Sequence, residues 1–294
     1  MGAVAHTTID IDSIRTQALE YSSIFLSAGP IRHVVIDDAI LPGPESISSF
    51  PLPEWERWHY EGDAYQVNKF TSSDAENAPE PWKSALYELI SPSFLPILET
   101  ITGIPKLLID PYFEGGGLHL SSENGILGLH TDFHVYKRLD LYRRVNIIVY
   151  LNPDWSEGDG GELTIQSARH PERGSKVIEP QWGRMVIFQT DDDSVHGFTN
   201  PVAPGKVRRS LATYYYTAIP TSNFSGDSTT HWREHGTFHG MARVRFLTSR
   251  LLMHVSRAFS LASHLSNPNQ GTKWWKSRSR RASHDRSDPK QTNR

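Results

Sequence analysis

The chain has 294 residues, of which 37% are hydrophobic and 21% charged, and it contains no cysteine. This composition supports a folded core and excludes a wholly disordered chain, a collagen and a coiled coil. Without cysteine, disulfides, zinc–thiolate sites and thiol nucleophiles are excluded, so any metal site must use histidine and carboxylate ligands. No apolar stretch is long enough to span a bilayer and the N-terminus lacks a secretory signal, so we expect a cytoplasmic protein.

Charge is unevenly distributed along the chain. Residues 267–294 contain eight basic and two acidic side chains, so the formal net charge of −3 divides into +6 for this tail and −9 for the rest. The acidic body argues against a nucleic-acid-binding core, and no nucleic-acid partner is expected. The tail is rich in Ser, Arg, Asn and Pro, which predicts disorder. Two roles stay open for it: a solubilising end, or an arm that contacts an anionic membrane or a protein partner.

The first 105 residues predict a mixed helical and extended part. Apolar spacing predicts helices over Ile11–Ser27, Pro81–Ile90 and Ser93–Thr102, and a β-branched run predicts a strand over His33–Ile40. Asp12 or Ser13 is the expected N-cap of the first helix, and Gly103 is expected to end the last one. Residues 45–78 are rich in Pro, Ser and polar side chains and predict loop with short strands.

From Lys106 onward, short β-rich runs follow one another with turn residues between them. The predicted strands are Lys106–Asp110, Gly117–Ser121, Ile126–Thr131, Val145–Leu151, Glu162–Gln166, Lys176–Ile178, Met185–Gln189 and Val207–Thr217. This pattern favours an antiparallel barrel or a two-sheet jelly roll over a parallel α/β sheet. We therefore predict a mainly β fold with flanking helices, in which residues 1–220 form a single domain. Its N-terminal α/β part would span 1–105 and its jelly-roll core 106–220.

Residues 221–266 are expected to form a C-terminal extension to this domain. Within it, His239–Leu265 carries apolar residues at helical spacing with arginines among them, which predicts a basic amphipathic helix. The apolar positions are Val244, Leu247, Leu251, Val255, Phe259 and Ala262. Packing against the barrel is one interpretation of this helix, and membrane-surface binding or dimerisation is the other.

Three side chains predict a metal site. His130 and Asp132 lie two apart at the end of a predicted strand, so they share a face with their Cα atoms roughly 6.5–7 Å apart. His196, which follows the run Met185–Gln189 and an acidic turn, is the best candidate for the third ligand. Two histidines and one carboxylate form the facial triad of non-haem Fe(II) oxygenases, which leaves coordination positions open for other ligands.

The last predicted strand adds an anion-binding side chain. Arg208 shares a face with Ser210, Ala212 and Tyr214, and an arginine buried in a barrel requires an anion. The far end of a dicarboxylate would satisfy it with a bidentate pair, and the hydroxyl of Ser210 could donate a further hydrogen bond. A buried salt bridge within the protein is the alternative interpretation.

Four motifs in this order resemble the 2-oxoglutarate- and Fe(II)-dependent dioxygenases, of the prolyl 4-hydroxylase-like branch. The motifs are His130-Thr-Asp132, the stretch Arg143–Trp155 followed by Gly160–Ile165, the stretch Gly183–His196, and Arg208–Ala212. The resemblance runs from about Lys106 to Ala218. It implies a double-stranded β-helix, in agreement with the strand pattern.

The resemblance also implies roles for particular residues. His130, Asp132 and His196 would hold iron, and Arg208 would grip the distal carboxylate of 2-oxoglutarate with support from Ser210 and Tyr150. It assigns no catalytic residue beyond the metal ligands. Weaker candidates for substrate or cosubstrate contacts are His119, Asn146 and His134.

The activity implied is hydroxylation of an unactivated C–H with release of succinate and CO2. Fe(II), 2-oxoglutarate and O2 would be required, with ascorbate as a stimulant. The substrate is expected to be a peptidyl proline or other protein side chain, or a small amino-acid-like metabolite; the family contains both kinds of enzyme. The alternative from another class is a non-catalytic binding or sensor protein that acts through its C-terminal helix and basic tail. The sequence does not determine the oligomeric state.

Overall fold

A computed structural model describes residues 7–220 and 230–232, together with scattered positions between 244 and 262. The chain divides into two compact units, Met1–Gly236 and Thr237–Arg294. In the second unit, the described positions are helical and exposed, and they include Val244, Leu251 and Phe259. The predicted basic tail, 267–294, lies outside the described residues. Among the helices that are described, none has the length and apolar character needed to cross a bilayer.

Four α-helices precede most of the strands in the first unit. They are α1 (Ile11–Thr16), α2 (Ala18–Ser27), α3 (Trp82–Leu89) and α4 (Leu95–Thr102), and three short 3-10 helices cover Pro44–Ser49, Ala75–Asn77 and Pro171–Arg173. The single helix predicted over Ile11–Ser27 is thus two helices that meet at Gln17. The expected N-cap was also wrong, because the Asp10 carboxylate accepts the hydrogen bond from the Ser13 N–H (3.0 Å). Gly103 ends α4 in the left-handed conformation (φ 67°), as expected.

Thirteen strands are described, and all of their pairings are antiparallel. They are β1 (His33–Ile36), β2 (His59–Glu61), β3 (Gln66–Ser72), β4 (Leu108–Ile109), β5 (Gly117–Thr131), β6 (Val135–Tyr136), β7 (Leu141–Tyr150), β8 (Leu163–Ser167), β9 (Ser175–Ile178), β10 (Met185–Gln189), β11 (Ser194–Phe198), β12 (Arg208–Thr217) and β13 (His231–Trp232). The order along the main sheet is β1-β10-β7-β12-β5-β11-β8-β9. The mainly β jelly-roll prediction is confirmed.

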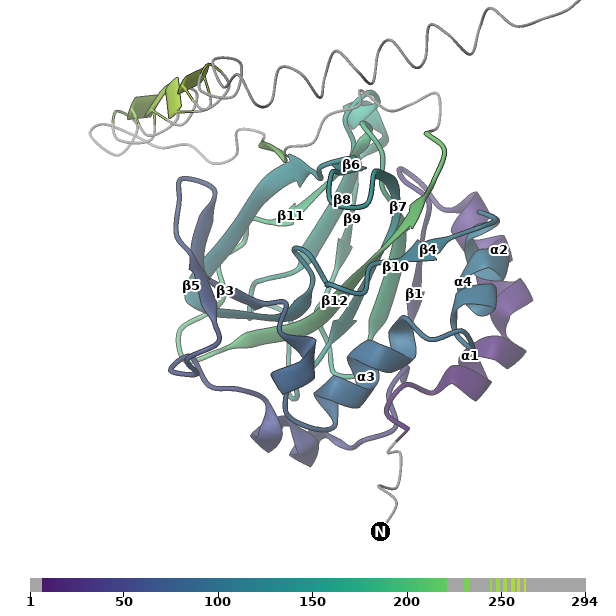
Figure 1. The fold of residues 1–294 in the computed structure, drawn as a ribbon. Coiled ribbons are helices and arrows are strands. Elements are labelled where there is room, and N and C mark those ends of the chain that lie inside the picture. The colour runs from purple at the N-terminus through teal and green to yellow at the C-terminus, as the bar shows by residue number, and fades with distance from the viewer. Residues whose placement is uncertain are drawn as a thin grey trace, which may run out of the picture. The chain divides into compact units, whose positions relative to one another are not determined.

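The long strand β5 joins the two layers of the jelly roll. Its first part pairs with β12, where Leu118 lies opposite Leu211, and its last part pairs with β11, where His130 lies opposite His196. One layer therefore contains β1, β10, β7, β12 and the start of β5, and the other contains the end of β5 with β11, β8 and β9 (Figure 1). The two strands predicted on either side of residues 122–125 are one continuous element.

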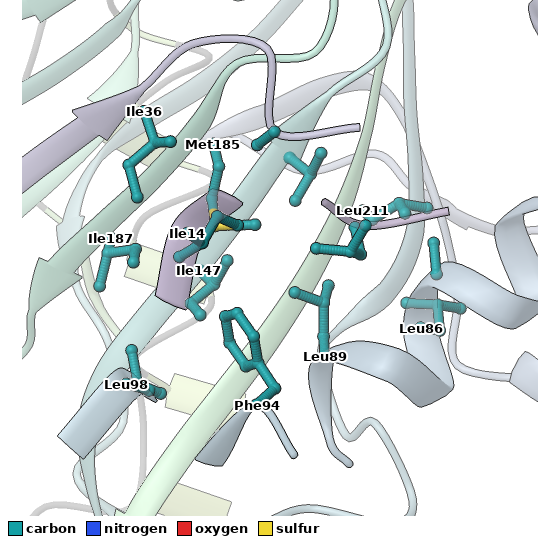
Figure 2. Close-up of a cluster of buried hydrophobic side chains, with 14 of the residues drawn as sticks. Ile14, Ile36, Leu86, Leu89, Phe94, Leu98, Ile147, Met185, Ile187 and Leu211 are labelled. Carbon is teal, nitrogen blue, oxygen red and sulfur yellow. The ribbon is translucent and has the colours of Figure 1, made fainter. Parts of the chain in front are cut away.

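The hydrophobic core lies between the helices and the outer face of the first layer. In Figure 2, Ile14 of α1, Leu86 and Leu89 of α3 and Leu98 of α4 surround the sheet residue Ile147. Every second residue of β7 faces this core, namely Val145, Ile147 and Val149, and all three are fully buried. The intervening residues face the inside of the jelly roll. The helices thus close one face of the sheet and leave its other face for the cavity described next.

Candidate functional site

The three predicted metal ligands converge inside the jelly roll. His130 lies near the end of β5, Asp132 follows that strand directly, and His196 lies in the middle of β11, opposite His130. One ligand atom from each residue lies within 4.8 Å of those of the other two. The Nε2 atom of His130 is 3.6 Å from Asp132 Oδ1, and the Nε2 atom of His196 is 3.3 Å from Asp132 Oδ2. All three residues are buried.

Hydrogen bonds to the backbone orient both imidazole rings. The Nδ1 atom of His130 is 2.8 Å from the Gly128 carbonyl, and that of His196 is 3.2 Å from the Ser194 carbonyl. A carbonyl accepts, so each Nδ1 carries the proton and each Nε2 presents its lone pair to the cluster. Burial, and then the neighbouring His196, lowers the pKa of His130 and keeps its ring neutral. Two imidazole nitrogen donors and one carboxylate suit Fe(II) with open coordination positions.

A buried arginine and an amide hold the carboxylate of Asp132. Arg143 Nη2 lies 3.0 Å from Asp132 Oδ2, and the Asn146 amide donates to the same oxygen at 2.8 Å. Arg143 Nε in turn donates to Asn146 Oδ1 at 2.8 Å, which closes the triangle. Burial alone would raise the pKa of Asp132, but the charge of Arg143 is the main cause that keeps it well below its usual value. Asp132 is therefore ionised and fixed in place before any metal binds.

Arg143 reaches this position because of a β-bulge. Tyr215 of β12 lies opposite Val145, whereas Tyr216 lies opposite Arg143, so Arg144 is an extra residue in β7. Strict alternation would place Arg143 on the opposite face of β7 from Asn146, because the two are three residues apart. With the bulge, Arg143 turns into the cavity, where its guanidinium stacks on the Tyr214 ring at 3.4 Å. Strand alternation alone therefore does not reveal the contact of Arg143 with Asp132.

Arg208 lies at another part of the same cavity and has no acidic partner there. Its Nε donates to the Gly161 carbonyl at 2.8 Å and its Nη2 donates to the Tyr150 hydroxyl at 3.2 Å. The guanidinium also lies 4.3 Å above the Phe198 ring. Among the described residues, no carboxylate lies within 4.0 Å of it. Burial lowers the pKa of Arg208, because a buried charge without a counterion is costly.

Gly161 is required for this arrangement. Its φ is +68°, a conformation that other residues rarely adopt, and a Cβ atom there would lie 2.9 Å from Cδ of Arg208. The glycine therefore lets a backbone carbonyl approach the guanidinium and accept its Nε hydrogen bond.

One cavity of about 240 Å³ joins the two ends of the site. His119, Asn146 and Ser210 line it, as the sequence predicted for residues near the substrate or cosubstrate. His119 Nε2 lies 3.2 Å from the Gly115 carbonyl, and burial is the main cause that lowers the pKa of His119 to about 3. This histidine is neutral and carries no charge into the site.

His134 is not among the residues that line this cavity, and its assignment as a substrate contact stays a prediction. The strand β5 ends at Thr131, and His134 lies beyond it. Its Nδ1 is 2.8 Å from Asp192 Oδ1 and its carbonyl accepts from the Arg143 N–H at 2.9 Å. Both contacts stabilise the chain next to the metal ligands, outside the described lining of the cavity.

Lys69 and Glu61 also line the cavity and were missed. They lie on β3 and β2, in the segment that was predicted to be mainly loop. Their strands add to the edge of the sheet at β5 and so extend the wall of the cavity.

Comparison with known proteins agrees with this geometry. Residues 116–216 match the model of the 2OG-Fe(II) oxygenase superfamily. Over these residues the chain is similar to 2OG-Fe(II) oxygenases. The match contains all three clustered ligands, the Arg143–Asn146 pair and Arg208, and it begins at the start of β5 and ends within β12.

The chain is also similar to two curated proteins. Prolyl 3-hydroxylase OGFOD1 of Mus musculus is 26% identical over 157 residues, which cover 52% of this chain and 27% of the mouse protein. The same enzyme of Xenopus laevis is 29% identical over 77 residues, which cover 25% of this chain and 15% of that protein. The matched region therefore spans about a quarter or less of the length of these relatives.

Among solved structures, a prolyl 4-hydroxylase from Phytophthora capsici is similar, with a TM-score of 0.49 and 20% identity. The similarity covers 84% of this chain and 76% of that one.

Proposed function

We propose that this protein is an Fe(II)- and 2-oxoglutarate-dependent dioxygenase that hydroxylates an unactivated C–H bond. One observation carries the proposal: a single cavity holds a His–Asp–His cluster with an ionised carboxylate and a buried arginine that has no carboxylate of a described residue within 4.0 Å. The first is a site for a divalent cation, and the second is a site for an anion. The superfamily match and the prolyl hydroxylase relatives support this assignment.

Different residues of the chain would bind the metal and the cosubstrate. His130, Asp132 and His196 would hold Fe(II), which when bound supplies dioxygen activation coupled to the oxidative decarboxylation of 2-oxoglutarate. Arg208 would bind the distal carboxylate of 2-oxoglutarate through its remaining N–H groups, with the hydroxyls of Tyr150 and Ser210 beside it. Overall, substrate C–H, O2 and 2-oxoglutarate give the alcohol, succinate and CO2. Ascorbate would act as a stimulant.

Aromatic side chains shield the metal end from water. The Trp232 ring of β13 lies 4.8 Å from the His130 ring, and the Phe188 ring lies 4.9 Å from that of His196. Leu127, Leu163 and Phe198 add apolar walls to the cavity. A dry site strengthens the contacts of the ionised groups and protects a reactive centre from side reactions.

The substrate is either a peptidyl proline or another protein side chain, or a small amino-acid-like metabolite. The name of the mouse and frog relatives supports the prolyl substrate. The charges that line the cavity bear on this choice.

The proposal is tested by cosubstrate turnover. Purified protein is incubated with Fe(II), ascorbate and 2-oxoglutarate in air, and succinate is quantified. We expect slow, iron-dependent release of succinate that is lost in Asp132→Ala. If wild-type protein bound neither metal nor 2-oxoglutarate, the chain would be a non-catalytic binding protein and the proposal would fail.

A further inference from the structure

A row of four polar side chains crosses the edge of the cavity. Glu61 of β2 lies opposite Lys69 of β3, Lys69 lies opposite Ser121 of β5, and Ser121 lies opposite Arg208 of β12. Residues opposite one another on neighbouring strands point to the same face, and all four line the cavity. With strands about 4.8 Å apart, the backbones of Lys69 and Arg208 are roughly 10 Å apart. Lys69 is thus a second cation on the wall that carries Arg208.

Lys69 is buried with most of its hydrogen-bonding capacity unused by the protein. Lys69 is only 8% exposed, and its Nζ donates to Gln66 Oε1 at 3.2 Å. Within the described part of the chain, no carboxylate lies within 4.0 Å of Nζ. Desolvation is the main cause that lowers the pKa of Lys69 to about 8. Lysine is almost never buried unless it is paired, so this ammonium indicates a partner that the protein does not supply.

The charges of the loaded cavity leave room for one more anion. The two positive charges of Fe(II) would offset the two negative charges of 2-oxoglutarate, and Arg143 offsets Asp132. Arg208 and Lys69 then remain against the single carboxylate of Glu61. That carboxylate is partly exposed and lies 3.8 Å from the exposed His59, so solvent screens it. The loaded site keeps one net positive charge near Lys69.

We infer that Lys69 binds an anionic group of the second substrate, a carboxylate or a phosphate. This inference rests on the proposed function, in which the distal carboxylate of 2-oxoglutarate takes Arg208. It names the substrate class: a small molecule that carries its own negative charge close to the carbon to be hydroxylated. A free amino acid has such a carboxylate, whereas a proline within a peptide has none. The cavity therefore favours the amino-acid-like metabolite over the peptidyl proline considered above.

Small anions test the inference without knowledge of the substrate. Protein loaded with Zn(II) and 2-oxoglutarate, which does not turn over, is titrated calorimetrically with acetate, with inorganic phosphate and with neutral acetamide. We expect saturable binding of acetate or phosphate, binding at least tenfold weaker in Lys69→Met, and no binding of acetamide. Acetate and phosphate separate the two kinds of anion. Lys69→Arg keeps the charge and should retain binding, which guards against a folding defect in Lys69→Met.

Lys83→Met is the matched control, because Lys83 lies outside the cavity and pairs with Glu76 (2.8 Å). It should bind the anions as the wild type does. Anion binding that is absent, or equal in wild type and Lys69→Met, overturns the inference.

The affinity for 2-oxoglutarate separates this inference from the proposed function. We expect Lys69→Met to bind 2-oxoglutarate within about threefold of wild type and Arg208→Met to lose it. If both variants lose it equally, Lys69 belongs to the cosubstrate site and the inference is wrong, while the proposed function stands. If wild-type protein binds no metal and no 2-oxoglutarate, the proposed function itself fails.

Discussion

Two buried arginines in one cavity differ in whether a carboxylate of the chain lies beside them. Arg143 has its counterion within the chain, since it lies 3.0 Å from Asp132 and is further tied to Asn146. Arg208 donates to two neutral groups, the Gly161 carbonyl and the Tyr150 hydroxyl, and no carboxylate of a described residue lies within 4.0 Å of it. Both guanidiniums also lie over aromatic rings. The same side chain is therefore satisfied by the protein at the metal end and left for a ligand at the other end.

Because of this difference, Arg143 contributes to the stability of the fold, whereas Arg208 contributes to ligand binding. A buried ion pair is strongly destabilised when one partner is removed, because the other charge is left without compensation. A buried charge without a counterion already bears that cost in the free protein, and its ligand removes it. Substitutions at the two arginines should therefore have opposite effects on stability, and each affects a different ligand.

The largest effect is expected for Asp132→Ala. The substitution removes a metal ligand and leaves Arg143 buried and unpaired, which costs about 3–5 kcal/mol of stability. Succinate release should fall at least about 100-fold, in line with the loss of metal binding. Calorimetric metal titration and chemical denaturation measure the two losses. In the double variant Asp132→Ala/Arg143→Met, stability should recover while metal binding does not; a double variant as unstable as the single one would contradict the pairing.

Arg208→Met should raise the KM for 2-oxoglutarate at least about 100-fold, equivalent to about 2.7 kcal/mol, because a charge-assisted contact to the cosubstrate is lost. Its stability should equal or exceed that of wild type, because a buried charge without a counterion is removed. Succinate assays and thermal denaturation test both parts. An unchanged KM would move the carboxylate site away from Arg208.

Arg143→Met should have the opposite effect to Arg208→Met: it should lower the stability and weaken metal binding. We expect a loss of about 3–5 kcal/mol in stability, since Asp132 keeps its charge without its partner. Affinity for Mn(II) or Fe(II) should fall 10–100-fold, as is typical when a group that orients a metal ligand is removed. The neighbouring Arg144→Met is the control, because Arg144 donates to Thr217 and lies away from the described lining of the cavity. Equal metal affinity in both variants would exclude a positioning role for Arg143.

The smallest effect is expected for Tyr150→Phe. It removes the hydroxyl that accepts from Arg208 at 3.2 Å, worth about 1 kcal/mol, so the KM for 2-oxoglutarate should rise about fivefold. Tyr215→Phe removes a hydroxyl of the same kind, which donates to the Leu89 carbonyl in the core. That control should lower the melting temperature without changing the KM. A KM effect in the control alone would refute the role of Tyr150.

The sequence was sufficient to predict the parts of the site whose residues lie close together on one strand. His130 and Asp132 are two residues apart, so strand alternation places both on one face. Arg208 and Ser210 are also two residues apart, and the pairing of β12 with β5 is regular there, so they too share a face. His196 was placed correctly beside them, although its strand β11 was not predicted. That strand has only five residues, contains Gly197 and follows an acidic turn, so its own residues give little β signal.

The sequence was insufficient where neighbours decide the structure. Lys69 lies in β3, whose residues are mostly polar and extended mainly because β5 pairs with them. The strand predicted over His33–Ile40 ends at Ile36, since the chain turns at Asp38, which has a φ of 54°. Arg143 was missed for a different reason: alternation assigns it to the wrong face.

The extra residue in β7 lets one strand serve two opposed environments. Val145, Ile147 and Val149 pack beneath the helices, and without the bulge Arg143 would join this series and enter the hydrophobic core as an isolated charge. The unpaired position of Arg144, and not only the composition of β7, therefore decides which face Arg143 occupies. Deleting Arg144 would make the ladder regular and leave Arg143 on the cavity side, whereas drawing Arg144 into regular pairing would turn Arg143 to the core side.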